Sequence, residues 1–329
     1  MQRAVSYLHL THLSHYGKLK GILHQKKERL TNTFMERTLI YYIDSQSSGK
    51  NITAFLKEKG YSRHIFTHLK RTEYGILKNG KWAYTSEQLQ EGDELTVQIV
   101  EEASSSQIVP VKMELVIVYE DEDILILDKA SDMPIHPSIH NYENTLANGL
   151  AHYFASKGIA FTYRCINRLD RDTTGLLIIA KNMLSAAVLS DMVKSRKIHR
   201  EYLAVAQGEI PDSGIIDAPI ARKENSAIER IVDFRRGERA VTYYRRLSYK
   251  NGYSLVSLKL ETGRTHQIRV HMKYLGYPLP GDFLYNPQYS RIKRQALHSH
   301  RLEFVHPITN EKLVFTSPLP PDMQFEQWD

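Results

Sequence analysis

Apolar and polar residues follow two different periods in the first hundred residues. Residues 39–43 are a short apolar run that predicts a strand, whereas apolar positions within 50–59 recur at helical spacing and predict a helix that ends at Gly60. Ser62 is placed to cap a second helix. Two more strands are predicted between 75 and 100, the first followed by an Asn-Gly turn. The pattern predicts a compact α/β unit over residues 35–100.

The arrangement of apolar runs changes after residues 101–110, a polar, Ser-rich stretch that predicts a linker. Beyond it, apolar or alternating runs predict strands at 115–119, 124–127, 176–180, 202–206 and 253–260. Helical spacing predicts helices at 146–154 and 183–196. Because these elements show no regular βαβ order, residues 111–329 are predicted to form a mixed α+β domain.

The composition is that of a soluble globular protein of about two domains. The chain has 329 residues, of which 42% are hydrophobic and 25% charged, which excludes a mostly disordered, collagen-like or coiled-coil chain. A single Cys excludes a disulfide scaffold and a Cys-rich zinc site. No apolar run is long enough to predict a transmembrane helix.

The net charge of +7 is concentrated near the start of the chain. Residues 1–34 hold six Lys and Arg residues and one acid, and they lack the apolar core of a secretory signal. This basic extension is expected to be an unstructured tail or the result of a start that belongs at Met35, with an organellar transit peptide as the alternative. The polyanion-binding surface is therefore expected in local basic clusters rather than over the whole protein.

The stretch 167–175 reads Asn-Arg-Leu-Asp-Arg-Asp-Thr-Thr-Gly and precedes the apolar run 176–180. Loops held at the end of a buried strand often carry catalytic groups. The stretch is equally typical of a polar turn whose Asp side chains accept backbone N–H bonds. Asp170 and Asp172 also fit the Asp-x-Asp-x-Thr pattern of HAD-like phosphatases, but there the apolar strand precedes the Asp pair, and here it follows. We therefore set the phosphatase aside.

A second polar stretch, 261–271, follows the predicted strand 253–260 and holds two arginines and two histidines. Thr265 is placed to cap a helix. His266 and His271 are five residues apart, which is not the i, i+4 spacing that puts two ligands on one helix face, so no zinc site is predicted. The stretch is typical either of a basic, solvated helix start or of arginines that bind phosphate or carboxylate groups in bidentate fashion.

Taken together and in order, these segments resemble the RluA family of RNA pseudouridine synthases. The family's His-Arg-Leu-Asp signature is represented by 167–170, and its Gly-Arg-Thr-His-Gln-Ile-Arg-x-His element by 263–271. Three later elements follow, Leu-Gly-Tyr-Pro-Leu-x-Gly-Asp at 275–282, Gln-Ala-Leu-His at 295–298 and Phe-x-His-Pro at 304–307. The resemblance covers residues 111–320. Residues 43–100 are similar, more loosely, to an S4-like RNA-binding domain.

The resemblance implies a mixed, largely antiparallel sheet flanked by helices, and the isomerisation of uridine in RNA to pseudouridine. In this reaction the N-glycosidic bond breaks and C5 of the uracil rejoins the same sugar carbon, so no cofactor and no metal are expected. Asp170 would be the essential carboxylate, either attacking C1′ or removing the 2′ proton. Arg269 would lie beside it, and Tyr202 would stack on the uracil and help remove the C5 proton.

The resemblance also implies substrate contacts around the pocket. Arg168 would fill the space that the flipped-out uridine leaves, and Ile268 would line the uracil site. The other residues expected to contact the substrate are Leu169, Thr174, Gly175, Arg264 and His266. RNA outside the pocket is expected to meet exposed basic residues, although basic runs are as often only solvated surface: Arg63, Lys70, Arg71, Lys194, Arg196, Lys197 and Arg200.

The sequence departs from the family pattern at two places. Asn167 stands where the family usually has His, three residues before the carboxylate. The family's Lys-Pro-x-Gly-x-x-x-His-Pro element is altered at 129–137, which affects the shape of that loop rather than the chemistry.

The expected protein is a monomeric, cytoplasmic RNA pseudouridine synthase without membrane association. Large-subunit ribosomal RNA is the expected substrate, because S4-bearing members of the family often act there. A tRNA-directed synthase and a catalytically silent RNA-binding protein are the alternatives. The intact set of Asp170, Tyr202 and Arg269 argues against the silent binder.

Overall fold

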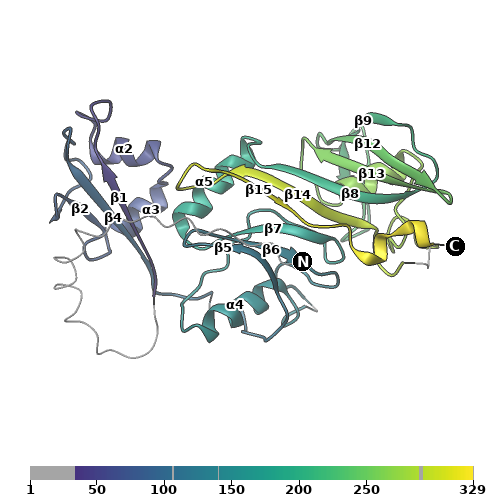
Figure 1. Cartoon of the computed structure of the whole chain (residues 1–329), viewed down its shortest axis with the longest axis horizontal. Coiled ribbons are helices and arrows are strands. Elements are labelled where there is room, and N and C mark those ends of the chain that lie inside the picture. The colour runs from purple at the N-terminus through teal and green to yellow at the C-terminus, as the bar shows by residue number, and fades with distance from the viewer. Residues whose placement is uncertain (1–33, 106, 140, 289–291, 329) are drawn as a thin grey trace, which may run out of the picture.

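The computed structural model describes residues 34–105, 107–139, 141–288 and 292–328 (Figure 1). A small N-terminal unit lies at one end of an elongated larger domain. The basic extension predicted over 1–34 lies, apart from Phe34, outside the described residues. Among the residues that are described, no helix has the length and apolar character needed to cross a membrane.

The N-terminal unit is a four-stranded sheet, in the order β1-β4-β2-β3, with two short helices packed on it. Its elements are β1 (Met35–Tyr42), α2 (Ile52–Glu58), α3 (Arg63–Leu69), β2 (Ile76–Lys78), β3 (Lys81–Trp82) and β4 (Glu94–Glu101). Ser62 caps α3 as predicted, since its Oγ accepts a hydrogen bond from Ile65 N. Asn79 and Gly80 have positive φ, as the predicted tight turn requires. The two-residue strand β3 was too short to predict.

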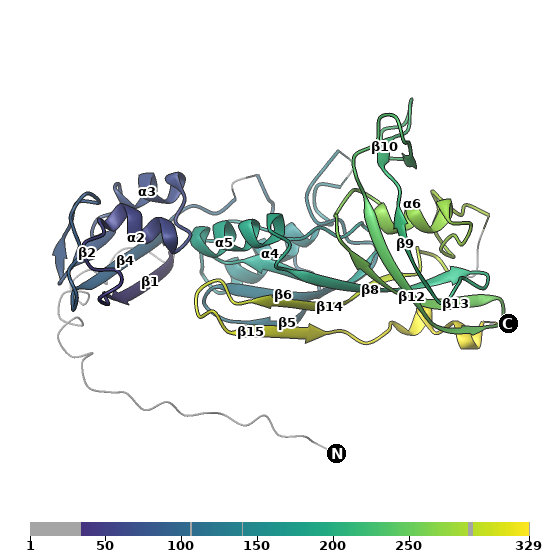
Figure 2. The ribbon, with the colours of Figure 1, turned by 90° about the horizontal axis from the view of Figure 1, so that it is seen from above.

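The larger domain is built on a nine-stranded sheet, in the order β5-β6-β7-β14-β8-β13-β12-β9, with β15 paired to β14. Only the β7–β14 pair is parallel among the described neighbours, so the predicted mixed, largely antiparallel α+β fold is confirmed. The first four strands of this sheet in chain order are β5 (Val116–Glu120), β6 (Ile124–Lys129), β7 (Thr174–Ala180) and β8 (His199–Gln207). The later strands are β9 (Ser213–Asp217), β12 (Val241–Lys250), β13 (Tyr253–Leu260), β14 (Leu297–Val305) and β15 (Lys312–Thr316). A separate hairpin, β10 (Ile220–Arg222) and β11 (Arg230–Val232), projects from the domain (Figure 2).

Two helices cover opposite faces of the sheet near β6 and β7. Helix α4 (Leu146–Ser156) packs on one set of alternating side chains, which includes Leu177, whereas α5 (Met183–Lys194) packs on the other set, which includes Ile178. Every residue of β7 is therefore buried. A strand buried on both faces shows no alternation, which explains the continuous apolar run that predicted it.

The segment predicted as a linker is packed against the larger domain. Glu101 is the last residue of β4, and Ser105 N donates to the carbonyl of Phe161. The hydroxyl groups of Ser104 and Ser105 accept hydrogen bonds from Phe161 N and Tyr163 N. Residues 101–105 therefore run along the surface of the larger domain as an ordered connection.

Candidate active site

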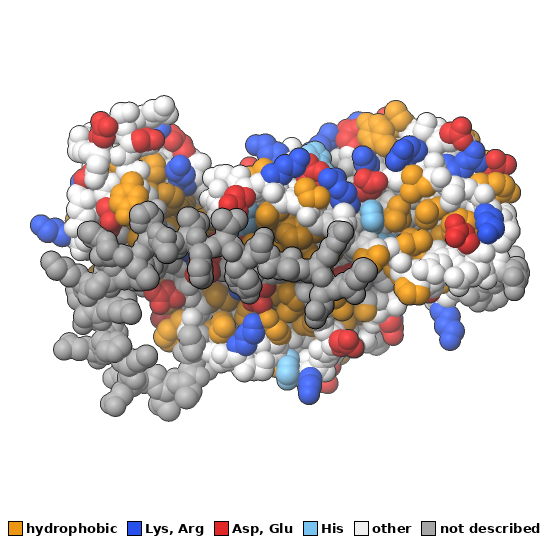
Figure 3. Space-filling model, in the orientation of Figure 1, with side chains coloured by type: hydrophobic (Ala, Val, Ile, Leu, Met, Phe, Trp, Pro, Cys, Tyr) orange, Lys and Arg blue, Asp and Glu red, His pale blue; other side chains and the backbone are white. Residues whose placement is uncertain are grey.

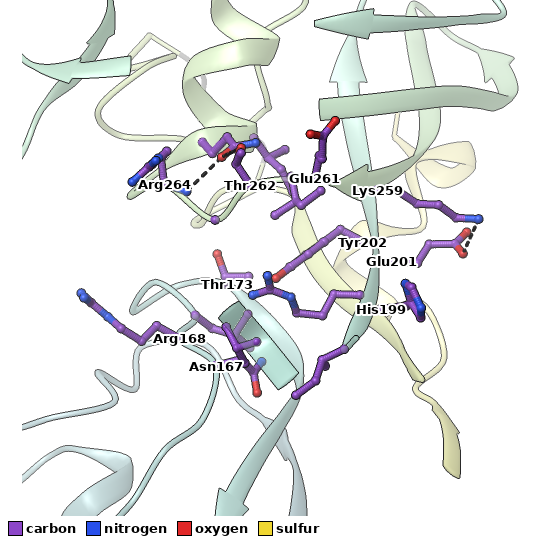
Figure 4. Close-up of a pocket in the computed structure, with 18 of the residues that line it drawn as sticks. Asn167, Arg168, Thr173, His199, Glu201, Tyr202, Lys259, Glu261, Thr262 and Arg264 are labelled. Carbon is purple, nitrogen blue, oxygen red and sulfur yellow. Dashed lines mark hydrogen bonds and ion pairs between the residues drawn. The ribbon is translucent and has the colours of Figure 1, made fainter. Parts of the chain in front are cut away.

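A groove of about 1000 Å³ lies where β8, β14 and the segment after β13 meet. The turn before β7, the carboxyl end of α5 and helix α6 (Gln267–Tyr274) complete its walls. Figure 4 shows Tyr202 reaching from β8 toward Thr173, with Arg168 on one side of the groove and Arg264 on the other. The volume lies at the upper end of the range for small-molecule pockets, so it has room for more than one nucleotide.

Asp170 lies in a turn that the neighbouring strands hold in place. Thr173 N donates to the Asp170 carbonyl and closes the turn. Gly175, with φ +107°, follows it at a point where a Cβ atom would lie 2.3 Å from the carbonyl oxygen of Ser299 on β14. Only glycine fits both the positive φ and this close approach of two strands. The turn is thereby held against the centre of the sheet.

A buried lysine supports the turn from behind. The Lys129 ammonium donates to the carbonyl oxygens of Ala130, Met133 and Arg171 at 2.7, 3.1 and 2.8 Å. Burial lowers the pKa of Lys129 to about 7, although the charges of Asp172 and Asp170 oppose the change. Three carbonyl acceptors match the three donors of an ammonium group. Lys129 therefore ties the altered 129–137 element to the residue next to Asp170.

Arg269 holds one oxygen of Asp170. Its Nη1 donates to Asp170 Oδ2 at 2.9 Å, while Nε and Nη2 donate to the two oxygens of Asp282 at 2.7 and 2.8 Å. Burial alone would lower the pKa of Arg269, but the hydrogen bonds and charges of Asp282 and Asp170 raise it. Asp282 is itself fully buried and also accepts from the backbone N–H groups of Leu284 and Tyr285. Two fixed acids thus hold a permanently charged guanidinium.

His266 faces the same carboxylate from the start of α6. It adopts a left-handed conformation, φ 56°, and no side chain caps the helix, so the predicted cap at Thr265 is wrong. The Tyr285 hydroxyl accepts from Arg230 N at 2.9 Å and lies 2.9 Å from His266 Nδ1. The other ring nitrogen, Nε2, faces Asp170 Oδ2 at 3.8 Å, and a neutral imidazole carries hydrogen on one of its two nitrogens. Burial lowers the pKa of His266, with Asp170 opposing, and favours this neutral form.

Tyr202 and Ile268 form the apolar part of the groove. Tyr202 is 4% exposed, and burial raises the pKa of its hydroxyl, while the nearby Arg200 opposes the rise. Arg200 was predicted only as an outer RNA contact, and the structure brings it to the tyrosine. Ile268 lines the groove beside them and is also buried.

The structure brings most of the predicted substrate contacts into the groove, but not all of them. Leu169, Arg168, Arg264 and His266 line it. Thr174 and Gly175 do not: Thr174 Oγ1 bonds to His298 Nδ1 at 2.9 Å, away from the opening. Their small size serves the packing of β7 on β14.

The predicted RNA-binding residues fall into two groups. Lys194, Arg196 and Arg200 line the groove, and Lys197 is exposed next to them. Arg63, Lys70 and Arg71 are exposed on the N-terminal unit. Figure 3 shows Lys and Arg gathered over the middle of the larger domain, near the notch between the two units.

Asn167, the departure from the family pattern, fastens the turn to β7. Its Oδ1 accepts from Ile178 N at 2.8 Å, which sets the orientation of the amide. Its Nδ2 is buried without a hydrogen-bond partner. The residue is 3% exposed, so its role is in the position of the turn rather than in contact with solvent.

Within the described part of the chain, one cluster has the composition of a metal site: Asp121, Asp123 and His306. Both Asp123 oxygens already accept from Arg37. His306 Nδ1 accepts from two backbone N–H groups, so Nε2 carries hydrogen and faces Asp121 at 3.1 Å. The imidazole offers no lone pair to an ion, and the donor set does not fit a metal.

Asp282, Lys129 and Tyr285 are the site residues that sequence reasoning did not single out. Asp282 stood in the recognised Leu-Gly-Tyr-Pro-Leu-x-Gly-Asp element, and Lys129 in the altered one, so each lay inside a matched motif. Their partners lie 13 and 42 residues away along the chain, which no local pattern reveals.

Comparison with known proteins identifies the family of the chain. A sequence model described as RNA pseudouridylate synthase matches residues 123–274. Uncharacterized RNA pseudouridine synthase YjbO of Bacillus subtilis is 39% identical over 273 residues, which cover 83% of this chain and 96% of the relative. Ribosomal large subunit pseudouridine synthase D of Escherichia coli is 35% identical over 262 residues, which cover 75% and 80%. The protein of the same name from Zymomonas mobilis is 40% identical over 229 residues, which cover 65% and 72%.

Solved structures show the same relation. The structure titled Human RNA Pseudouridylate Synthase Domain Containing 1 has a TM-score of 0.54 and 28% identity, over 64% of this chain and 86% of that chain. The stretch matched by the sequence model includes Asp170, Tyr202 and Arg269. The chain therefore belongs to the RluA family of RNA pseudouridine synthases, enzymes that isomerise uridine to pseudouridine in RNA.

Proposed function

We propose that this enzyme modifies uridines in large-subunit ribosomal RNA and that Asp170 is the reacting carboxylate. The substrate class is supported by relatives from two bacteria that are named as large-subunit pseudouridine synthases. The residue is supported by the geometry of the groove.

The observation that carries the proposal is the half-occupied carboxylate of Asp170. Its side chain is 29% exposed, and Oδ2 is bound to Arg269. Oδ1 accepts no hydrogen bond from the described residues, so one oxygen faces the groove with its lone pairs free. A positioned, ionised carboxylate with a free oxygen is what attack at a carbon or removal of a proton requires.

The reaction needs no outside electrons. The bond from N1 to C1′ breaks, and C5 bonds to C1′ after the uracil turns. The proton that C5 then loses is matched by one that N1 gains, so the product is an isomer of the substrate. Asp170 acts at the ribose, either at C1′ or at the 2′ hydrogen, and both routes use the same free oxygen.

The other groove residues hold the base. Tyr202 offers a ring for stacking on the uracil, and burial raises the pKa of its hydroxyl, which favours the protonated form. Ile268 closes the apolar side of the uracil site. Arg168 lies at the groove wall, where its side chain can fill the space that the flipped-out base leaves. Flipping itself costs the RNA roughly a few kcal/mol in lost stacking.

Pseudouridine mapping tests the substrate. Total RNA from cells with and without the gene is compared, and the deletion is complemented with the wild type and with Asp170→Ala. We expect a site in large-subunit ribosomal RNA to vanish and to return only with the wild type. Loss of a tRNA site instead would contradict the ribosomal substrate. Loss of no site, with an inactive purified enzyme, would support the silent binder.

A further inference from the structure

Two acid–arginine pairs join the N-terminal unit to the larger domain. Arg37 on β1 donates from Nε and Nη2 to the two oxygens of Asp123, at 3.0 and 2.9 Å. At the end of β4, both oxygens of Glu101 accept from Arg164 at 2.8 Å. Asp123 is 2% exposed and Glu101 is 5% exposed. Bidentate pairs of this kind restrict orientation as well as distance.

The same two acids hold the start of α5. Asp123 Oδ1 accepts from Asn182 Nδ2 at 2.8 Å, and Asn182 in turn caps the helix. Glu101 Oε1 accepts from Met183 N at 3.1 Å. Negative charge at a helix N-terminus is favourable. Each acid therefore joins an arginine to the start of α5.

Apolar packing completes the contact. Leu184 of α5 belongs to the buried core of the N-terminal unit, and Val188, one turn on, packs on the same core. Gly60 lies so close that a Cβ atom there would be 2.6 Å from Val188 Cγ2. The core of the small unit is thus closed by a helix of the larger domain.

Helix α5 connects this contact to the groove. Ten residues separate Leu184 in the contact from Lys194 on the groove wall, about 15 Å along the helix axis. Figures 1 and 2 show α3 beside α5 in both views. Exposed basic side chains lie at both ends of this path, on or just after α3 and at or just after the end of α5: Arg63, Lys70, Arg71, Lys194 and Lys197.

We propose that the N-terminal unit is fixed on the catalytic domain and that one RNA molecule binds to both at once, with a folded flanking segment held at a set distance from the target uridine. The partner is an RNA long enough to reach from the groove to α3. The proposal rests on the proposed function for the identity of that RNA. A unit on a flexible tether would accept flanking segments at many distances, whereas this one accepts them at a single distance.

Spin labels test the fixed arrangement without RNA chemistry. Tyr84→Cys and Ile215→Cys, both at exposed positions, are labelled in a Cys165→Ala background. We expect one narrow distance distribution for the free protein, unchanged when ribosomal RNA is added. A broad distribution, or a new distance on binding, would overturn the proposal.

Lengthening the connection tests the consequence for binding. Eight Gly and Ser residues are inserted after Glu102 in the Asp170→Ala protein, and the dissociation constant for a ribosomal RNA fragment is measured. A fixed unit predicts a change below about 2-fold, whereas a tethered unit would lose affinity through a lower effective concentration. With Arg37→Ala and Arg164→Ala added, the same insertion should weaken binding about 10-fold. An equal loss from the insertion alone would contradict the proposal.

Charge reversal on α3 identifies the second contact. Lys70→Glu should weaken binding of the long fragment at least 5-fold, and a short stem-loop that carries only the target uridine should lose less. Lys81→Glu, the same change at an exposed position on β3, is the matched control and should have little effect. Equal losses for Lys70→Glu and Lys81→Glu would rule out α3 as the contact. Modification of the short stem-loop by the wild type reports the proposed function separately.

Discussion

Asp170 in the groove and Asp123 at the contact between the two units are both aspartates held by an arginine. Asp123 is 2% exposed, and its oxygens accept from Arg37, Asn182 and Ser185. Asp170 is partly exposed and accepts one hydrogen bond, from Arg269, among the described side chains. The charge partner is the same kind of group in both places, whereas the exposure and the number of bound carboxylate oxygens differ.

The difference supports a structural role for Asp123 and the proposed reactive role for Asp170. Arg269 directs Nε and Nη2 to Asp282 and reaches Asp170 through Nη1 alone. Arg37 gives one donor to each oxygen of Asp123, and Asn182 and Ser185 at the start of α5 also donate to Oδ1. A carboxylate with both oxygens bound stabilises the fold, whereas one held at a single oxygen keeps the other for chemistry.

Replacing Asp170 should have the largest effect. Asp170→Asn keeps the shape and the contact with Arg269 but removes the reactive anion. We expect the single-turnover rate to fall by at least about 10⁴-fold with RNA affinity retained. Asp172→Asn, two residues on in the same turn, is the matched control and should keep its rate within 10-fold. A variant that retained even a hundredth of the wild-type rate would remove Asp170 from the chemistry.

Replacing Asp123 should act on stability instead. Asp123→Ala leaves Arg37, Asn182 and Ser185 without their acceptor and should cost roughly 3–5 kcal/mol in the free energy of unfolding. Glu122→Ala is the control next to it, because Glu122 pairs with the same arginine at the surface and should cost less than about 1 kcal/mol. Urea denaturation measures both. Similar costs for the two variants would mean that the buried pair does not hold the units together.

Acid should weaken the region beneath Asp170 through a buried histidine. Burial lowers the pKa of His298 to about 4 from 6.5, so the unfolded chain binds the proton first as the pH falls. The contribution of His298 to the free energy of unfolding is therefore complete above pH 6.5. It falls by about 3 kcal/mol as the pH drops from 6.5 to 4. The free energy of unfolding at pH 7 and pH 4.5 should differ less in His298→Asn than in the wild type. His64→Asn, at an exposed position, should leave the difference unchanged.

Replacing Asp282 should loosen the position of Arg269 and of the Asp170 carboxylate, and should lower the rate less than replacing Asp170 itself. Asp282→Asn removes one charged acceptor from Arg269, which then has less to hold it in place. We expect the maximal rate to fall about 10²-fold while KM changes little. A comparable rise in KM with an unchanged maximal rate would show that Asp282 serves binding instead.

The sequence was sufficient for the parts of the fold that local pattern determines. The run 176–180, the helix at 183–196 and the cap at Ser62 all follow from residues close in the chain. The central strand β14 was missed, because Leu-His-Ser-His-Arg carries two histidines at largely buried positions. Those histidines are satisfied by Thr174 and Ser317, which lie far away in the sequence.

In the groove, too, the sequence predicted some residues and missed the contacts between distant segments. Motif resemblance predicted Asp170, Tyr202 and Arg269, and the structure brings them to one groove. It did not predict that Asp282 restrains the arginine, since that pairing depends on the loop after α6. Thr265 failed as a helix cap because His266, one residue on, takes the left-handed conformation that brings its ring to Asp170.

The most direct test compares the two aspartates in one reaction. Asp170→Asn and Asp123→Asn are each saturated with the same ribosomal RNA fragment at a temperature where both are folded, and pseudouridine is measured in a single turnover. Asp170→Asn should form none, and Asp123→Asn should form it within 10-fold of the wild-type rate. Pseudouridine formed by Asp170→Asn, or a complete loss in folded Asp123→Asn, would contradict the assignment of chemistry to the half-occupied carboxylate.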